Sequence, residues 1–370
     1  MQQSSGFVIL HLSLINGIGP STIKSLIEKK PLNFNINEIY QLSIYELTNF
    51  FRLSEIQAKK IKEGLENKNI FDEEISLIEK HKINWSTFLD NNYPELLKNI
   101  HLPPSVIYWQ GKLNADEKLI SIIGSRKAND YSKRMIENIA LSLIEFGWTI
   151  VSGGAIGADT MAHEAALKFG GKTISILGSG LLKPYPYSNK KLFQKIVEND
   201  GAIISSFALN CDSYPENFPA RNRIISGISK GCIVVQAGIK SGTRITALYA
   251  LEQGREVFAI PGSIDDELSA GCNKLIQEGA KLITCANDIL EEFGESNLKN
   301  DDTGKYEQTE IVELSFEDKI IQYCKDPCSI EELSEKFEIS LNDLQFKLFQ
   351  LQLDGKIIQN FAGMWQQNGL

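Results

Sequence analysis

The hydrophobic positions between residues 119 and 290 alternate between short apolar runs and longer stretches with helical spacing. The runs KLISIIGS and WTIVSGG are followed by SKRMIENIALSLIEFG and ADTMAHEAALKFG, in which apolar residues recur at helical intervals. Further apolar runs are KTISILGSG, AIISSF, GCIVVQAG and EVFAIPG, with the helical pattern GTRITALYALEQG between the last two. Continuously apolar strands joined by helices are typical of a parallel sheet covered on both faces. We therefore predict an α/β fold over residues 119–290, a Rossmann-like, doubly wound and mostly parallel sheet.

Two regions precede the predicted sheet domain. Residues 1–68 have helical spacing and contain LINGIGPST, a glycine-rich turn of the kind that joins two short helices. We predict a small helical domain there, of the SAM or helix-hairpin-helix type. The glycines either serve only the geometry of the turn or present their amides to a DNA phosphate. Residues 69–118 include the proline-bearing stretch YPELLKNIHLPPSVIYWQG, so we expect an extended connector that packs on the sheet domain.

Two further regions follow the predicted sheet domain. Residues 291–312 are polar and acidic, which predicts a linker. Residues 313–370 show three helical patterns and then two short apolar runs, the order found in a winged-helix-like domain. Ser329 and Glu332 have the spacing of a capping box at the start of one of these helices.

The net charge of −9 is unevenly distributed along the 370 residues. Residues 119–290 carry 18 lysines and arginines against 16 acidic residues, whereas residues 291–370 carry 7 against 17. An acidic surface repels phosphates, so we expect the C-terminal domain to contact protein or to regulate rather than to bind DNA. Any basic patch on the nearly neutral sheet domain must be local.

Composition argues against several classes of protein. No apolar run reaches the length that spans a bilayer, and the N-terminus lacks the features of a signal peptide, so we expect a cytoplasmic protein without a membrane partner. The six cysteines are scattered without a C-x-x-C pair and are expected to be reduced thiols. Cys324 and Cys328 lie four apart with no histidine nearby, and we expect no metal site.

Nearly every predicted strand ends in a loop of glycine or other small residues. In an open parallel sheet, ligands collect at the carboxyl ends of the strands. Glycine lets the backbone approach a phosphate, and the following helix N-terminus adds partial positive charge. We therefore predict an anion-binding crevice, and the loop residues that we assign to it are Ser125, Gly153, Gly154, Ser241, Gly242 and Thr243.

Four cations and one aromatic residue fall on these or adjacent segments. Arg126 ends the first strand, Lys240 precedes the strong helix, and Arg221 and Arg223 lie in NFPARNRIISGIS shortly after Phe218. We interpret this stretch as a loop stiffened by its proline. Phosphate contacts combined with base stacking on an aromatic ring are typical of single-stranded nucleic-acid binding. The alternative for each arginine alone is a surface salt bridge.

The chain does not carry the pattern of a familiar enzyme. No G-x-G-x-x-G follows the first strand, so no dinucleotide cofactor is expected, and no Walker loop or Ser/His/Asp set is present. Asp159 and His163 lie four apart and are compatible with acid–base chemistry. We favour a structural role for both, Asp159 at a helix N-terminus and His163 packed nearby, and expect no catalytic residues.

The sequences of the loops and their order along the chain resemble those of the DNA-processing protein A family, also called DprA or Smf. The resemblance rests on SIIGSR, IVSGGAIGADTMAHEAAL, TISILGSGLLKPYPYSN, FPARNRIISGIS, SGTRITALYALEQGREVFAIPGS and GCNKLIQEGAKLI, within about residues 95–290. It implies a protein without enzymatic turnover that binds and protects single-stranded DNA during natural transformation. It also implies a RecA-type recombinase as partner and a homodimer formed through the Rossmann-like domain.

The same resemblance implies where the DNA pocket lies. By motif, Arg126, Phe218 and Lys240 correspond to the family's pocket, and Arg221 and Arg223 belong to the same signature.

The chain also departs from the family's common pattern. Many members carry an acidic residue at the position of Gln236, GID in place of GAD, and a basic residue near the position of Glu216. The last of these predicts weaker DNA binding.

Two alternative functions share the predicted pocket, a nucleoside-monophosphate phosphoribohydrolase and a nucleotide sensor. The hydrolase needs a glutamate one turn into the helix, where this chain has Thr246 and Ala247, and Glu252 comes too late to reach the loop.

Overall fold

The computed structural model describes residues 5–295, apart from 33 and 115–117, and residues 320–367, apart from 322, 325–326, 338 and 361–362. Contacts within the chain divide it into two units, residues 1–298 and residues 299–370. In the described residues, no helix is both long and apolar enough to cross a membrane.

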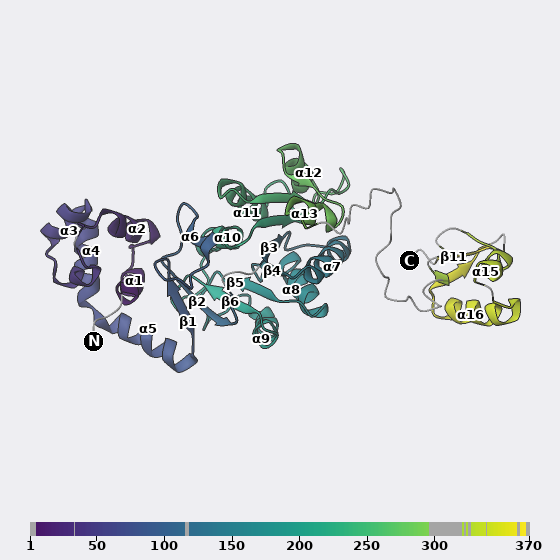
Figure 1. Ribbon diagram of the computed structural model, residues 1–370, viewed down its shortest axis with the longest axis horizontal. Coiled ribbons are helices and arrows are strands. Elements are labelled where there is room, and N and C mark those ends of the chain that lie inside the picture. The colour runs from purple at the N-terminus through teal and green to yellow at the C-terminus, as the bar shows by residue number, and fades with distance from the viewer. Residues whose placement is uncertain are drawn as a thin grey trace. The chain divides into compact units, whose positions relative to one another are not determined.

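A nine-stranded sheet organises the first unit (Figure 1). Its spatial order is β1-β2-β6-β5-β4-β3-β7-β8-β9, and every neighbouring pair from β6 to β9 is parallel, whereas β1 and β2 form an antiparallel edge. The strands are β1 Asn84–Thr87, β2 Val106–Gly111, β3 Lys118–Ile123, β4 Trp148–Ser152, β5 Thr173–Ile176, β6 Ala202–Ser205, β7 Gly231–Val234, β8 Glu256–Ala259 and β9 Lys281–Leu282. This confirms the predicted α/β fold with a mostly parallel sheet.

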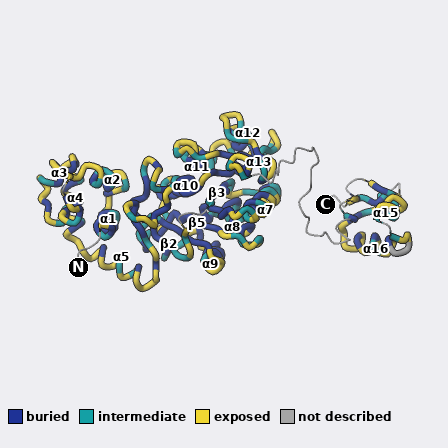
Figure 2. Tube along the Cα trace, in the orientation of Figure 1, coloured by how far each residue is buried: buried dark blue, intermediate teal, exposed yellow. Residues whose placement is uncertain are grey.

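Helices cover both faces of the sheet, which explains why its strands are continuously apolar. Along β3, Ile120 and Ile122 belong to one apolar core, whereas Leu119 and Ile123 belong to the other. The first core includes residues of α7 (Asp130–Glu145), α8 (Ala158–Lys168) and α13 (Asn287–Glu292). The second includes residues of α10 (Asn217–Ile228), α11 (Gly242–Glu252) and α12 (Ala270–Gln277). In Figure 2 the strands are buried and the outer sides of the helices are exposed.

The strand order reverses at β3. The chain leaves β3 through α7 to its neighbour β4 and later returns to place β7 on the other side of β3. Loops that follow β3 and β7 therefore diverge at the same edge of the sheet and leave a crevice between them.

The sequence prediction was wrong for residues 217–228, which form the helix α10 rather than a loop. Pro219 is the third residue of this helix. Proline is tolerated in the first turn because the backbone N–H that it lacks has no partner within the helix there. The helix α9 (Lys190–Glu198) was not predicted either.

The region before the parallel strands is mostly helical. Helices α1 (Ser5–Leu14), α2 (Pro20–Lys29), α3 (Ile44–Phe51) and α4 (Glu55–Glu66), with the 3₁₀ helix η1 (Ile36–Gln41), form its first part. Residues 69–118 are more regular than the expected connector. They contain α5 (Lys68–His81), the short helix α6 (Glu95–Lys98) and the two edge strands β1 and β2.

The described part of the second unit has its own small core. Helices α15 (Ile330–Phe337) and α16 (Leu341–Leu353) precede an antiparallel pair, β10 (Ile357–Gln359) and β11 (Trp365–Gln367). Leu333, Leu348 and Trp365 are buried together. The predicted capping box is present, since Ser329 and Glu332 each accept a hydrogen bond from the other's backbone N–H. The linker predicted at 291–312 lies outside the described residues from 296 onward.

Candidate nucleic-acid interface

A cavity of about 410 Å³ lies at the carboxyl ends of β3, β4 and β7. Its walls come from the loop after β3, the loop after β4, the first turns of α10 and the N-terminus of α11. The lining residues that the argument below uses are Ser125, Arg126, Lys127, Ala155, Asp159, Phe218, Arg221, Asn222, Ser241, Gly242, Thr243 and Thr246. The crevice predicted from the glycine-rich loops is therefore present at the point where the strand order reverses.

Two guanidinium groups lie near the ring of Phe218. The Cζ atom of Arg126 is 5.6 Å from the ring centroid, and the Cζ atom of Arg221 is 5.7 Å from it. Phe218 is half-buried and Arg126 is exposed, whereas Arg221 is only 5% exposed. The negative face of an aromatic ring attracts nearby cations. An anion that enters here meets two positive charges beside an aromatic surface.

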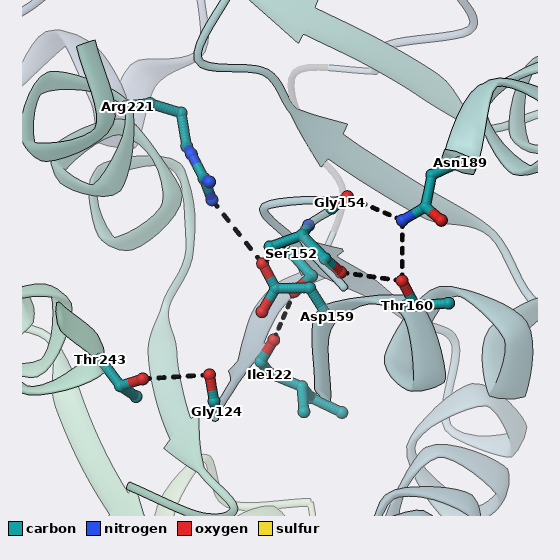
Figure 3. A network of polar contacts seen from close by, with 10 residues as sticks. Ile122, Gly124, Ser152, Gly154, Asp159, Thr160, Asn189, Arg221 and Thr243 are labelled. Carbon is teal, nitrogen blue, oxygen red and sulfur yellow. Dashed lines mark hydrogen bonds and ion pairs between the residues drawn. The ribbon is translucent and has the colours of Figure 1, made fainter. Parts of the chain in front are cut away.

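Arg221 is paired with a buried carboxylate (Figure 3). Its Nη1 atom lies 3.7 Å from Asp159 Oδ2, and the same carboxylate oxygen accepts a hydrogen bond of 3.3 Å from the backbone N–H of Ala155. Burial raises the pKa of Asp159, and the positive charge of Arg221 opposes that rise. Burial also lowers the pKa of Arg221, and repulsion by Arg126 lowers it further. A bound phosphate would relieve that repulsion.

Gly153 and Gly154 lie beneath the cavity and are fully buried. A Cβ atom on Gly153 would overlap Arg221 Nη1 and lie 2.6 Å from Asp159 Oδ2. Gly154 has φ of +68°, and a Cβ atom there would lie 2.6 Å from the ring of Phe193. Neither glycine is among the residues that line the cavity. Both make room for side chains around the site, which differs from the direct ligand contact that the sequence suggested.

The N-terminus of α11 closes another side of the cavity. The Ser241 hydroxyl caps this helix by accepting a hydrogen bond of 3.2 Å from the Thr243 backbone N–H. The Thr243 hydroxyl donates a 3.0 Å hydrogen bond to the carbonyl of Gly124, which ties α11 to the loop after β3 (Figure 3). Gly242 is exposed at the first helical position. Partial positive charge at a helix N-terminus attracts anions.

Hydrogen bonds within the loop after β3, and from the first residue of α8, fix the conformation of this loop. The Ser125 hydroxyl accepts a 3.0 Å hydrogen bond from the Lys127 backbone N–H, and the Ser125 carbonyl accepts one of 3.1 Å from Ala158. This fixes the loop that presents Arg126. Lys240 is exposed just before Ser241 and does not line the cavity itself.

The family model of DNA recombination-mediator protein A matches residues 84–294 of this chain, more than half of it. The chain belongs to that family. All of the residues that line the cavity fall inside the matched region.

Individual members of the DNA recombination-mediator protein A family are similar to this chain over much of their length. Protein Smf of Synechocystis sp. is 36% identical over 290 residues, which cover 76% of this chain and 71% of that protein. The X-ray structure of DNA processing protein A from Streptococcus pneumoniae superposes with a TM-score of 0.68 at 34% identity, covering 79% of this chain and 99% of that one. DNA processing protein A from Helicobacter pylori, whose structure concerns its single-stranded DNA binding mode, has a TM-score of 0.51 at 30% identity and covers 57% and 95%.

The structure separates Arg223 from the other residues of the family signature. Arg223 is five positions after Phe218 on α10, which places it about 140° around the helix from the ring. It is half-buried on that other side, and burial lowers its pKa. It does not line the cavity.

The sequence analysis missed the lining residues Lys127 and Asn222, whose side chains are polar. Lys127 follows Arg126 directly, and Asn222 lies one helical turn after Phe218. Recognition of NFPARNRIISGI as a helix would have placed Asn222 on the face of Phe218, because residues four apart share a helix face.

Gln236 and Glu216, which depart from the family's common pattern, lie in different environments. Gln236 is fully buried, and its side-chain oxygen accepts hydrogen bonds from the Asn129 backbone N–H and the Ser132 hydroxyl near the start of α7. Its amide nitrogen donates to Asp266 at 3.4 Å. Glu216 is exposed immediately before α10.

Asp159 and His163 do not form an acid–base pair at the cavity. His163 is fully buried, its Nδ1 atom lies 2.7 Å from the Thr173 hydroxyl, and burial lowers its pKa to about 3. Among the described residues that line the cavity, Asp159 is the only carboxylate, and it is paired with Arg221. Thr246 lines the cavity at the position where the hydrolase interpretation needs an acid.

Proposed function

We propose that this protein binds single-stranded DNA in the cavity at the carboxyl ends of β3, β4 and β7. The observation that carries the proposal is the placement of the Phe218 ring close to the guanidinium groups of both Arg126 (5.6 Å) and Arg221 (5.7 Å). An unpaired base stacks on the ring while neighbouring phosphates meet Arg126 and the α11 N-terminus. Paired bases in a duplex are not free to stack in this way.

Membership of the DNA recombination-mediator protein A family supports the wider role. We propose that the protein protects incoming DNA during natural transformation and helps to load a RecA-type recombinase, and that it acts as a homodimer through its Rossmann-like domain. The similarity to the Helicobacter pylori protein, whose structure concerns single-stranded DNA binding, supports the choice of ligand.

Fluorescence anisotropy with a labelled oligo-dT across a salt series tests the proposal. Arg126→Ala is expected to weaken binding at least tenfold, because a hydrogen-bonded or stacked cation is lost at the centre of the site. Lys240→Ala removes an exposed charge, so we expect a milder loss and a salt slope smaller by about 0.7. Lys133→Ala, on an exposed position of α7, is the matched control.

Competitors distinguish the alternatives. An unlabelled single strand should displace the probe, and neither a duplex nor AMP should do so at similar concentrations. Efficient displacement by AMP would favour the nucleotide sensor or the phosphoribohydrolase. Binding that is indifferent to both Arg126→Ala and Lys240→Ala would show that the DNA lies elsewhere.

A further inference from the structure

A second hollow lies beside the first, along the helix α9. This cleft has a volume of about 860 Å³, and we name it the α9 cleft after its lining residues Lys183, Tyr185, Tyr187, Lys190 and Gln194. Tyr185 is 46% exposed and Tyr187 is 76% exposed. Two accessible aromatic rings that line the same cleft offer a joint apolar surface to a ligand.

The α9 cleft lies next to the cavity around Phe218, and residues of both line a third, small hollow. A small hollow of about 40 Å³ is lined by Arg126, Phe218 and Arg221 from the cavity and by Tyr185 from the cleft. The rings of Tyr185 and Phe218 meet edge to face with centroids 6.0 Å apart. Tyr185 therefore lines both the small hollow and the α9 cleft, Phe218 lines the small hollow and the cavity, and Tyr187 lines the α9 cleft.

The segment that carries the two tyrosines is fixed in place. Buried Asn189 donates hydrogen bonds from Nδ2 to the Gly154 carbonyl at 3.0 Å and to the Thr160 hydroxyl at 2.8 Å (Figure 3). These bonds attach the segment to the loop after β4 and to the first turn of α8, which carries Asp159. The aromatic surfaces are thus preorganised relative to the cavity, which lowers the entropy lost on binding.

Cations lie next to the tyrosines. Lys190 Nζ is 5.6 Å from the ring centroid of Tyr187. Lys183 lines the same cleft and forms an ion pair of 2.9 Å with Asp212. In the part of the chain that the structure describes, no carboxylate forms an ion pair with Lys190, so its charge is available to a phosphate beside the ring.

We propose that the α9 cleft holds a further stretch of the same DNA strand, which continues from Phe218 across Tyr185 to Tyr187. Bases stack on the tyrosine rings and a phosphate meets Lys190. Aromatic platforms combined with a cationic groove are how proteins bind single strands without regard to sequence. This inference rests on the proposed function, because the strand enters the cleft from the cavity.

Oligo-dT of increasing length, from about 4 to about 16 nucleotides, tests the inference in the full-length protein by anisotropy. Tyr187→Ala is expected to leave the affinity for the shortest oligomers unchanged and to weaken binding of the longest roughly tenfold. Lys190→Gln should act at the same lengths and reduce the salt slope by about 0.7, the value for one phosphate of a single strand. Lys191→Gln is the matched control, since it removes the same charge from the next exposed residue of α9, which does not line the cleft.

The outcomes separate this inference from the proposed function. Arg126→Ala should weaken binding at every length, and if it does not, the cavity is not the DNA site. If Tyr187→Ala and Lys190→Gln match Lys191→Gln at every length while Arg126→Ala still weakens binding, the cavity stands and the cleft inference fails. It also fails if the cleft variants weaken the shortest and the longest oligomers equally, or if the wild type binds no oligomer.

Discussion

Arg126 and Arg221 lie near the same aromatic ring but in different physical environments. Arg126 is exposed, whereas Arg221 is buried against Asp159 over the space left by Gly153. A buried charge without a partner is strongly destabilising, so the pair Arg221–Asp159 must be kept or removed together. Arg126 is therefore available to bind a ligand, whereas Arg221 also stabilises the structure of the site.

The stability of three variants distinguishes the two roles. Arg221→Met should lower the free energy of unfolding by about 3 kcal/mol or more, because it leaves the Asp159 carboxylate buried and unpaired. Asp159→Asn in the same chain should restore much of that loss. Arg126→Met, at an exposed position, should stay within about 0.5 kcal/mol of wild type. Urea unfolding followed by tryptophan fluorescence measures all three, and an Arg221→Met variant as stable as wild type would contradict the account.

The sequence identified the loop glycines but not what they do. Their number predicted a crevice, and a crevice is present. That Gly153 leaves space for a guanidinium depends on α10 crossing above it, which is a contact between residues 68 positions apart. Local pattern alone cannot supply such a contact.

The helix α10 determines which side chains reach the cavity. In the sequence its proline and small residues favoured a loop, because the helical periodicity is masked by Pro219 at its start and Gly227 near its end. Helical spacing puts Phe218, Arg221 and Asn222 toward the cavity and turns Arg223 away. A loop would have allowed all of the cations to converge.

Substitution at Arg223 tests this geometry. Because its side chain lies on the opposite side of α10 from the ring of Phe218, Arg223→Gln should change the affinity for oligo-dT by less than about twofold, whereas Arg126→Gln should weaken it at least tenfold. Anisotropy at one fixed salt concentration measures both. Equal losses for the two variants would mean that the strand also covers the other side of α10.

For the molecule as a whole, the sequence predicted the parallel core but not its antiparallel edge. The core strands follow a repeated strand–helix pattern along the chain. By contrast, β1 and β2 join the sheet through β6, and β2 pairs with residues about 94 positions away, Tyr108 with Ser205 at one end and Gly111 with Ala202 at the other. Such pairing depends on tertiary contacts that a short apolar run does not reveal. The uneven charge was visible in the sequence, and we expect it to make the acidic C-terminal region an unfavourable surface for DNA.

The most direct test of the account is to find where the strand contacts the full-length protein. Oligo-dT crosslinked to the protein by ultraviolet light, followed by mass spectrometry of the digested adducts, gives the contacted peptides. We expect adducts on the peptides that contain Phe218 and, for longer oligomers, Tyr185 or Tyr187. Adducts confined to residues 5–66 or 320–367 would contradict the assignment of the cavity as the DNA site.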